Sequence, residues 1–357
     1  MSAAPMDDSA SGSGLRDDLA KTIDRVFETH CARPVRESAE GGQWPAGLWA
    51  ALEEVGLPLA ALPESAGGSD LAFDDAMFAL RRTAYHGAPV PLAETMLAGR
   101  LLVAAGLKVP AGAITVAPVA VREALRIEGG KLSGNASRVP WGDLCGHVLV
   151  AAESGGKEVV ALVSTEGASS GVEKNLAGEP RAALRFDATA VIASAPLENA
   201  SFRLAAEGAL YRSVQMAGAL ERVLEYALAY ANERVQFGRP IGKFQAIQHL
   251  LAVLAGHAAA ASAAAEAAVE ASAAAPDEIM VAVAKSRCGE AAGKGAEIAH
   301  QVHGAMGFTR EHNLHYVTRR LWSWRDEFGN ETHWQTRLGR RVASMGADAL
   351  WPMLTGR

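Results

Sequence analysis

Residues 233–252, "ERVQFGRPIGKFQAIQHLLA", are the stretch that decides the fold. Gly238 and the proline two residues after it favour a turn, so one helix ends near Arg234 and the next begins at Gln245. Arg234 is a permanent cation with a planar fork that suits a pyrophosphate, and the backbone N–H groups of the new helix add to such an anion site. Phe237 offers an aromatic face beside it. The plainer alternative is a basic helix end closed by a turn, with no ligand.

Long helices are predicted on both sides of this turn. The upstream helix has apolar residues at spacings of three and four: Val214, Ala217, Leu220, Leu224, Leu228 and Ala231. Downstream, an alanine-rich helix should run from Gln245 to Pro276, a third over 277–303, and a fourth should start within "EHNLHYVTRRL" at 311–321. Residues 202–357 are therefore expected to form a C-terminal four-helix bundle.

The pattern is different before residue 202. Short apolar runs separated by glycine turns predict a small antiparallel β-domain over 109–201. Residues 15–108 show helical periodicity interrupted by a Pro/Gly-rich loop and are expected to be an N-terminal helical domain. Residues 1–14 are polar and acidic, without the features of a signal peptide, and are expected to be a disordered leader. The predicted fold class is α+β, in the order helices, β-domain, helical bundle.

Composition excludes several classes of function. The net charge of −6 argues against a nucleic-acid surface as the main function. Glu, Lys and Gly interrupt the Ala-rich stretches, so no apolar run is expected to reach the length of a membrane span. Cys31, Cys145 and Cys288 are far apart and indicate neither a zinc site nor a disulfide framework, so no metal is expected. The expected compartment is the cytoplasm.

The decisive stretch strongly resembles the acyl-CoA dehydrogenase family, and so do three others. "QVHGAMGFTREHNLHYVTRR" at 301–320 is similar to the Gln-x-x-Gly-Gly-x-Gly segment that the family has before its last helices. "LPLAALPESAGGSD" at 57–70 resembles the family's Pro-Glu-x-x-Gly-Gly loop, and "RAALRFDATAV" at 181–191 resembles its strand before the bundle. The resemblance covers nearly the whole chain, in the right order.

The resemblance implies FAD, an acyl-CoA substrate, and removal of the Cα and Cβ hydrogens as a proton and a hydride. It also implies a tetramer with each flavin at a subunit boundary, and electron-transfer flavoprotein as acceptor. Arg234, Phe237 and Gly238 would lie against the neighbour's FAD, and the adenosine and pyrophosphate end would be held by Gln245, Gln301 and the backbone around Gly304. The family's second glycine is Ala305 here. His303, in the same segment, is expected to be a packing or capping residue.

Two features of the family are missing. Nothing between 110 and 150 resembles the Thr-Glu-Pro-x-x-Gly-Ser-Asp loop that holds the flavin ring. Trp141 is the nearest flavin-facing candidate, although a tryptophan packing under a β-turn would look the same. The second missing feature is the base, which in the family is a glutamate before a glycine, nine residues after an arginine. Counting from Arg319 places Phe328 there, followed by Gly329.

Some members carry the base on the helix before the Arg-x-x-Phe-Gly turn instead. That position is Gly208 here, with Ala209 at the neighbouring substrate-arginine position. Glu207 is one residue away and turned by about 100° on a helix. Glu207, Glu327 and Glu331 are possible substitutes for the base, because a displaced glutamate can still reach a substrate. The alternative for each is a solvated charge near basic helix ends. The catalytic residue is left unassigned.

These gaps favour one subunit of a heteromeric acyl-CoA dehydrogenase, a heterotetramer of the kind that acts in bacterial lipid metabolism, notably steroid degradation. The partner subunit would supply the flavin-holding loop and the glutamate. Three alternatives remain open: a self-sufficient homomeric dehydrogenase with a relocated base, a flavin oxidase or monooxygenase of the same fold, and a scaffold that binds no flavin.

Overall fold

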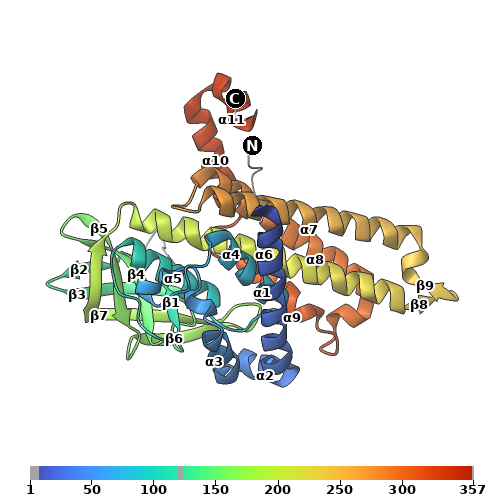
Figure 1. The fold of residues 1–357 in the computed structure, drawn as a ribbon, viewed down its shortest axis with the longest axis horizontal. Helices are drawn as coiled ribbons and strands as arrows, with labels where there is room; N and C mark the ends of the chain where they lie inside the picture. The colour runs from blue at the N-terminus through green and yellow to red at the C-terminus, as the bar shows by residue number, and fades with distance from the viewer. Residues whose placement is uncertain (1–7, 119–123, 356–357) are drawn as a thin grey trace, which may run out of the picture.

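The computed structural model describes residues 8–118 and 124–355 (Figure 1). The N-terminal helices are α1 (Asp8–His30), α2 (Arg33–Glu40), α3 (Ala46–Glu54), α4 (Phe73–Tyr85) and α5 (Leu92–Ala104), with short 3-10 turns at Leu57–Leu59 and Glu64–Ala66. Residues 8–14, expected in a disordered leader, continue helix α1, since adding turns to a formed helix costs little. The rest of that leader, 1–7, lies outside the described residues.

The middle domain is a seven-stranded sheet. Its strands are β1 (Ile114–Val116), β2 (Arg126–Glu128), β3 (Lys131–Pro140), β4 (His147–Ser154), β5 (Lys157–Ser164), β6 (Ser169–Lys174) and β7 (Pro180–Pro196). Strand β4 pairs with both β2 and β5, which closes the ring β4-β2-β3-β7-β5 around a separate apolar core. The sequence predicted an antiparallel sheet, but the observed sheet is mixed, because β4 runs parallel to β1 and β2. The β2–β3 hairpin lies between β1 and β4 in the chain and provides the crossover that parallel pairing needs.

The C-terminal bundle consists of α6 (Ala200–Glu233), α7 (Gln245–Ala271), α8 (Glu278–His303) and α9 (Leu314–Asp326). Strands β8 (Val235–Gln236) and β9 (Arg239–Pro240) form a hairpin between α6 and α7, followed by a 3-10 turn at Ile241–Lys243; another occupies Gly304–Phe308. The expected helices are present. Two more follow, α10 (Glu331–Met345) and, after a 3-10 turn at Ala347–Ala349, α11 (Leu350–Thr355); both project from the body (Figure 1).

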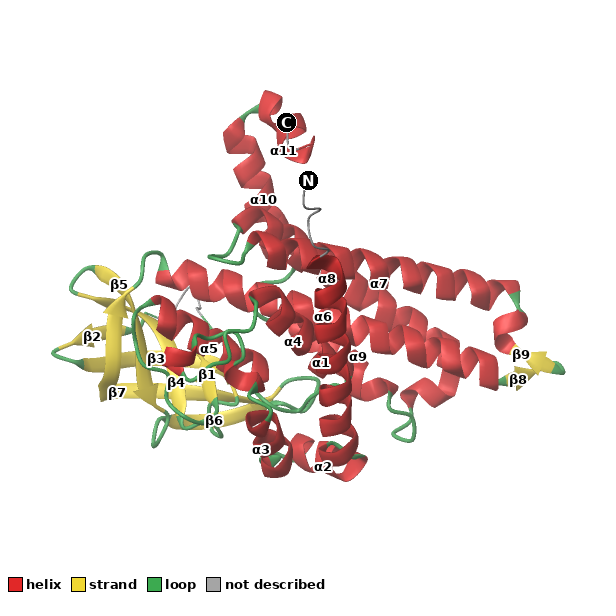
Figure 2. Ribbon diagram, in the orientation of Figure 1, coloured by secondary structure: helices red, strands yellow, loops and turns green. Residues whose placement is uncertain are grey.

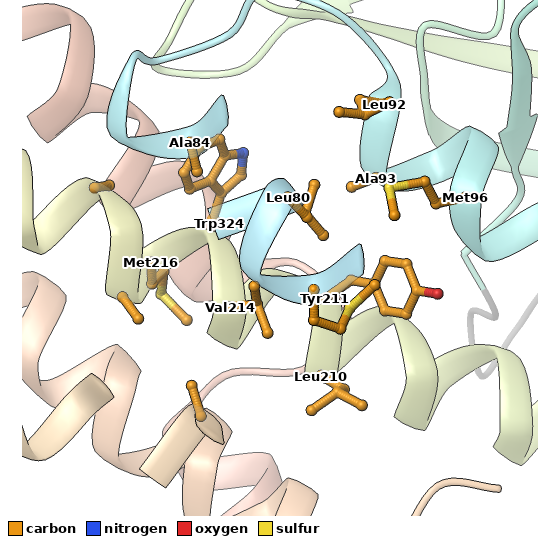
Figure 3. Close-up of a cluster of buried hydrophobic side chains, with 14 of the residues drawn as sticks. Leu80, Ala84, Leu92, Ala93, Met96, Leu210, Tyr211, Val214, Met216 and Trp324 are labelled. Carbon is orange, nitrogen blue, oxygen red and sulfur yellow. The ribbon is translucent and has the colours of Figure 1, made fainter. Parts of the chain in front are cut away.

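Helix α6 is the centre of the molecule, because it packs against α4, α5, α7, α8 and α9. Figure 3 shows part of this core, to which α4 contributes Leu80, α5 contributes Met96, α9 contributes Trp324, and α6 contributes Leu210 and Val214. The sheet lies at one end of the long helices and the β8–β9 hairpin at the other (Figure 2). The hairpin is therefore presented away from the body of its own chain.

Helix α7 is long and apolar enough to cross a membrane, contrary to the expectation that no such run exists. Its alanines raise the mean hydropathy although the segment also contains polar residues. The helix packs along α6 and α8 as a member of the bundle, and 28% of its most apolar window is buried.

Candidate functional site

The β8–β9 hairpin is closed by a two-residue turn, Phe237 and Gly238, in which both residues have positive φ (51° and 78°). A tight turn of this type matches the twist of the strands but is strained for a residue with a side chain. The Phe237 side chain is nevertheless 92% exposed, with Phe244 near its edge at 6.1 Å between ring centroids. A strained and exposed aromatic ring at the tip of a projecting hairpin indicates a binding role.

The arginine just before the hairpin is also free to bind a ligand. Arg234 ends α6, is exposed, and forms no ion pair with any residue in the described part of the chain. Gln245 is the first residue of α7 and is exposed as well. A guanidinium without a carboxylate, next to a helix start and an open aromatic ring, fits a phosphate-bearing group brought by another molecule.

The second segment of this site lies at the end of α8. Gln301 is exposed in its last turn, and Gly304 ends the helix with a φ of 56° and open space where a side chain would be. His303 is buried and stacks on Tyr230 of α6 at 4.6 Å, which joins the end of α8 to the end of α6 just before Arg234. The structure thus brings the two predicted cofactor segments to neighbouring helix ends.

His303 is a packing residue in this arrangement. Its ring shares a hydrogen bond with the Ala299 carbonyl at 2.7 Å, and burial lowers its pKa to about 4, so the ring is neutral at pH 7. Trp141 is likewise buried, at 2% exposure, with its ring packed edge-on against Trp44 and its backbone N–H donating to the Pro180 carbonyl. Neither side chain is free to touch a ligand in this chain.

The two positions at which the family has its catalytic base, Gly208 and Phe328, are in contact. The ring of Phe328, in the turn between α9 and α10, lies directly on Gly208 of α6: a Cβ there would come within 3.0 Å of three ring carbons. Neither residue can accept a proton. Spacing along the sequence identified both positions, and the fold places them in one contact, with no acid in it.

Glu327, next to Phe328, is neither a free base nor a solvated charge. Its carboxylate pairs with Arg181 on β7 and accepts a hydrogen bond from Arg212 Nε on α6 at 2.8 Å. Burial alone would raise the pKa of Glu327, but the two arginine charges outweigh it and lower the pKa to about 2. The carboxylate is therefore ionised and fully engaged at neutral pH.

These contacts belong to a larger buried network that the sequence did not suggest. Arg212 also pairs with Glu94 on α5, Arg181 pairs with Glu179 at 3.1 Å, and Glu179 lies 3.1 Å from Arg320 on α9. Three arginines and three glutamates thus balance their charges across the N-terminal helices, the sheet and the bundle. A single Arg or Glu inside an apolar helical stretch, such as Arg212 in "ALYRSVQMAGAL", is the one signal that points to such a network.

The other two candidate acids also face structural partners. Glu207 is buried, and its carboxylate lies 3.2 Å from both Arg100 on α5 and Arg203 on its own helix. Burial raises its pKa while both arginines oppose the rise. Glu331 begins α10 and pairs with Arg325. Both acids are therefore engaged in ion pairs.

Comparisons with known proteins find relatives that match most of the chain. The family model described as acyl-CoA dehydrogenase, N-terminal domain, matches residues 16–108, and the one for the C-terminal domain matches 204–331. An acyl-CoA dehydrogenase IpdE2 from Mycobacterium tuberculosis is 30% identical over 86% of this chain and 89% of its own length; its counterpart in Mycolicibacterium smegmatis is 29% identical over 86% and 90%. A steroid acyl-CoA dehydrogenase structure, Tcur3481-Tcur3483, superposes with a TM-score of 0.83 at 25% identity, covering 94% of this chain and 99% of the other.

Proposed function

This chain belongs to the acyl-CoA dehydrogenase family of oxidoreductases, and from that premise we propose that it is one subunit of a heteromeric, FAD-dependent enzyme. Its partner is a second subunit of the same fold that carries the catalytic glutamate. The complex, a heterotetramer in the cytoplasm, removes the α- and β-hydrogens of an acyl-CoA thioester. We infer a bulky acyl group of the steroid-degradation class, because the solved relative Tcur3481-Tcur3483 is a steroid enzyme.

One observation carries this proposal: the chain presents cofactor-binding groups outward but has no base at either family position. Arg234 and Phe237 are exposed at the β8–β9 hairpin, which lies at the far end of the long helices (Figure 1), while Phe328 rests on Gly208 in the place of the glutamate. A self-contained dehydrogenase needs the cofactor-binding groups and the base within one subunit or one homomer. A subunit that completes its neighbour's site needs only the cofactor-binding groups.

When bound, FAD would supply the hydride acceptor for the β-hydrogen, and the glutamate of the partner subunit would take the α-proton, which together would leave a carbon–carbon double bond. The role of this chain is to hold the cofactor. Arg234 would neutralise the pyrophosphate, Phe237 and Gly238 would lie against the dinucleotide, and Gln245, Gln301 and the Gly304 backbone would hold its adenosine end. Electron-transfer flavoprotein would be the electron acceptor of the complex.

Purification of this chain with and without its partner tests the proposal. The complex should be yellow, and acyl-CoA should bleach its flavin absorbance. The chain alone should be colourless. A chain that binds flavin stoichiometrically by itself and is bleached by acyl-CoA would instead indicate a self-sufficient homomer, and production of hydrogen peroxide would indicate an oxidase.

Replacement of Arg234 by alanine should weaken FAD binding in the complex by about ten- to a hundredfold, because a charge-assisted hydrogen bond contributes about 1.5–3 kcal/mol. The flavin-to-protein absorbance ratio after gel filtration measures this. Arg185→Ala, an exposed arginine on β7 far from the hairpin, is the control and should leave the ratio unchanged. Equal flavin content in all three proteins would remove Arg234 from the cofactor site.

A further inference from the structure

Phe328 has a conformation that ordinary core packing does not require. Its φ is 54°, in the left-handed region that is unfavourable for a bulky side chain. Its ring is only partly buried and lies at the edge of the main core. Burial of one partly exposed ring stabilises the fold only slightly compared with the cost of the strained backbone. Packing alone therefore does not explain why the ring is held in this position.

The turn that carries Phe328 is held from several directions. The Phe328 carbonyl accepts a hydrogen bond from Trp334 Nε1 at 2.9 Å, and buried Lys285 donates to the carbonyls of Arg325 at 2.6 Å and Gly329 at 2.7 Å. The network around Glu327 fixes the preceding residue. These contacts keep residue 328 facing α6.

What the ring covers is one short stretch of α6. Gly208 lies under it, without a side chain, and one turn further along the helix the Arg212 guanidinium carbon is 5.7 Å from the ring centroid. A larger residue at 208 would displace the ring. The glycine and the ring are therefore complementary: together they fill the space between the α9–α10 turn and α6 with apolar protein.

We propose that Phe328 is a plug that closes this chain's own acyl site, so that acyl-CoA binds only where the partner supplies the base. The proposal rests on the proposed function, because the plugged space is the one in which both family base positions would face a substrate. Phe328 thereby determines specificity: it assigns the substrate to one of the two kinds of subunit.

Equilibrium binding of butyryl-CoA to this chain alone tests the plug. The unmodified chain should show no saturable binding up to 1 mM, roughly the upper end of ordinary substrate affinities. Phe328→Gly should bind at least tenfold more tightly than that limit. Glycine suits the left-handed φ, which helps the variant to fold, and circular dichroism confirms that it has folded. Phe328→Leu, which keeps an apolar cover, is the matched control and should not bind.

Each outcome decides the question. Binding by the unmodified chain would show that the site is open and would overturn the plug. If neither it nor folded Phe328→Gly binds, the ring is not what excludes the thioester, and the proposal is equally overturned; Phe328→Ala repeats the test if the glycine variant does not fold. Failure of the proposed function is detected separately, as a wild-type complex without flavin, in a measurement that leaves Phe328 unchanged.

Discussion

Glu327→Gln should lower the free energy of unfolding by about 3–5 kcal/mol, because it removes the shared carboxylate from Arg181 and Arg212. The Arg181 and Arg212 side chains are only 4% and 3% exposed, so water cannot replace the lost charge. Denaturant unfolding of the chain measures the loss. A catalytic base would behave differently, since its replacement reduces turnover and leaves stability nearly unchanged. A loss below about 1 kcal/mol would contradict the network described here.

The ion pairs of Glu327 with Arg181 and Arg212 also predict that the stability of the chain depends on pH. The folded pKa of Glu327 is about 2 and its ordinary value is 4.5, so its contribution to stability is complete above pH 4.5 and is lost as the pH falls towards 2. The difference in stability between the wild type and Glu327→Gln should shrink over that window. Glu331→Gln is the control on the same turn. Its partner Arg325 is 41% exposed, so the expected loss is less than about 1 kcal/mol.

Gly218→Ala should destabilise the fold by about 3 kcal/mol, although alanine is the better helix former by about 1 kcal/mol. Gly218 lies in the middle of α6, where α4 crosses it, and an added Cβ would overlap the Arg81 backbone carbonyl. Backbone cannot rotate away as a side chain can, so the two helices would have to separate. Unfolding by urea, followed by helical circular dichroism, gives the difference.

Gly256→Ala serves as the comparison, because it should change the free energy of unfolding in the opposite direction. Gly256 is exposed on α7, and a Cβ built there meets no atom within 4 Å. With no clash, only the helix propensity remains, and the variant should be more stable by about 1 kcal/mol. If Gly218→Ala were as stabilising as Gly256→Ala, the close approach of α4 and α6 at Gly218 would be wrong.

The sequence predicted the fold well where local signals suffice. The turn after Arg234 and the start of α7 at Gln245 follow from glycine, proline and apolar spacing, which act over a few residues. The parallel partners of β4 could not be predicted, because strand periodicity says which face is buried but not which strand lies alongside. Helices α10 and α11 were missed because α10 is mostly polar, although Trp334, Leu338 and Val342 recur along it at a spacing of four residues.

In the candidate site, too, the sequence predicted the local features and missed those that depend on tertiary packing. Counting along the chain located Gly208 and Phe328, but contact between residues so distant in sequence depends on how α6 and α9 pack. Glu327 looked like an ordinary acid among charged neighbours, since a sequence does not reveal that Arg181 and Arg212 come from two other elements to enclose it. Lys285, which holds the turn, is one of three Lys and Arg residues on α8, and its position in the sequence does not distinguish it from Arg287 and Lys294.

The shared carboxylate has a consequence for how such a chain can diverge. Position 328 touches a glycine and can change alone, whereas position 327 is tied to arginines on two distant elements and can change only if they change too. A subunit whose partner supplies the base is free to lose the glutamate at 328, while the acid beside it must stay. Among relatives, residue 327 should therefore vary together with residues 181 and 212, and residue 328 independently of them.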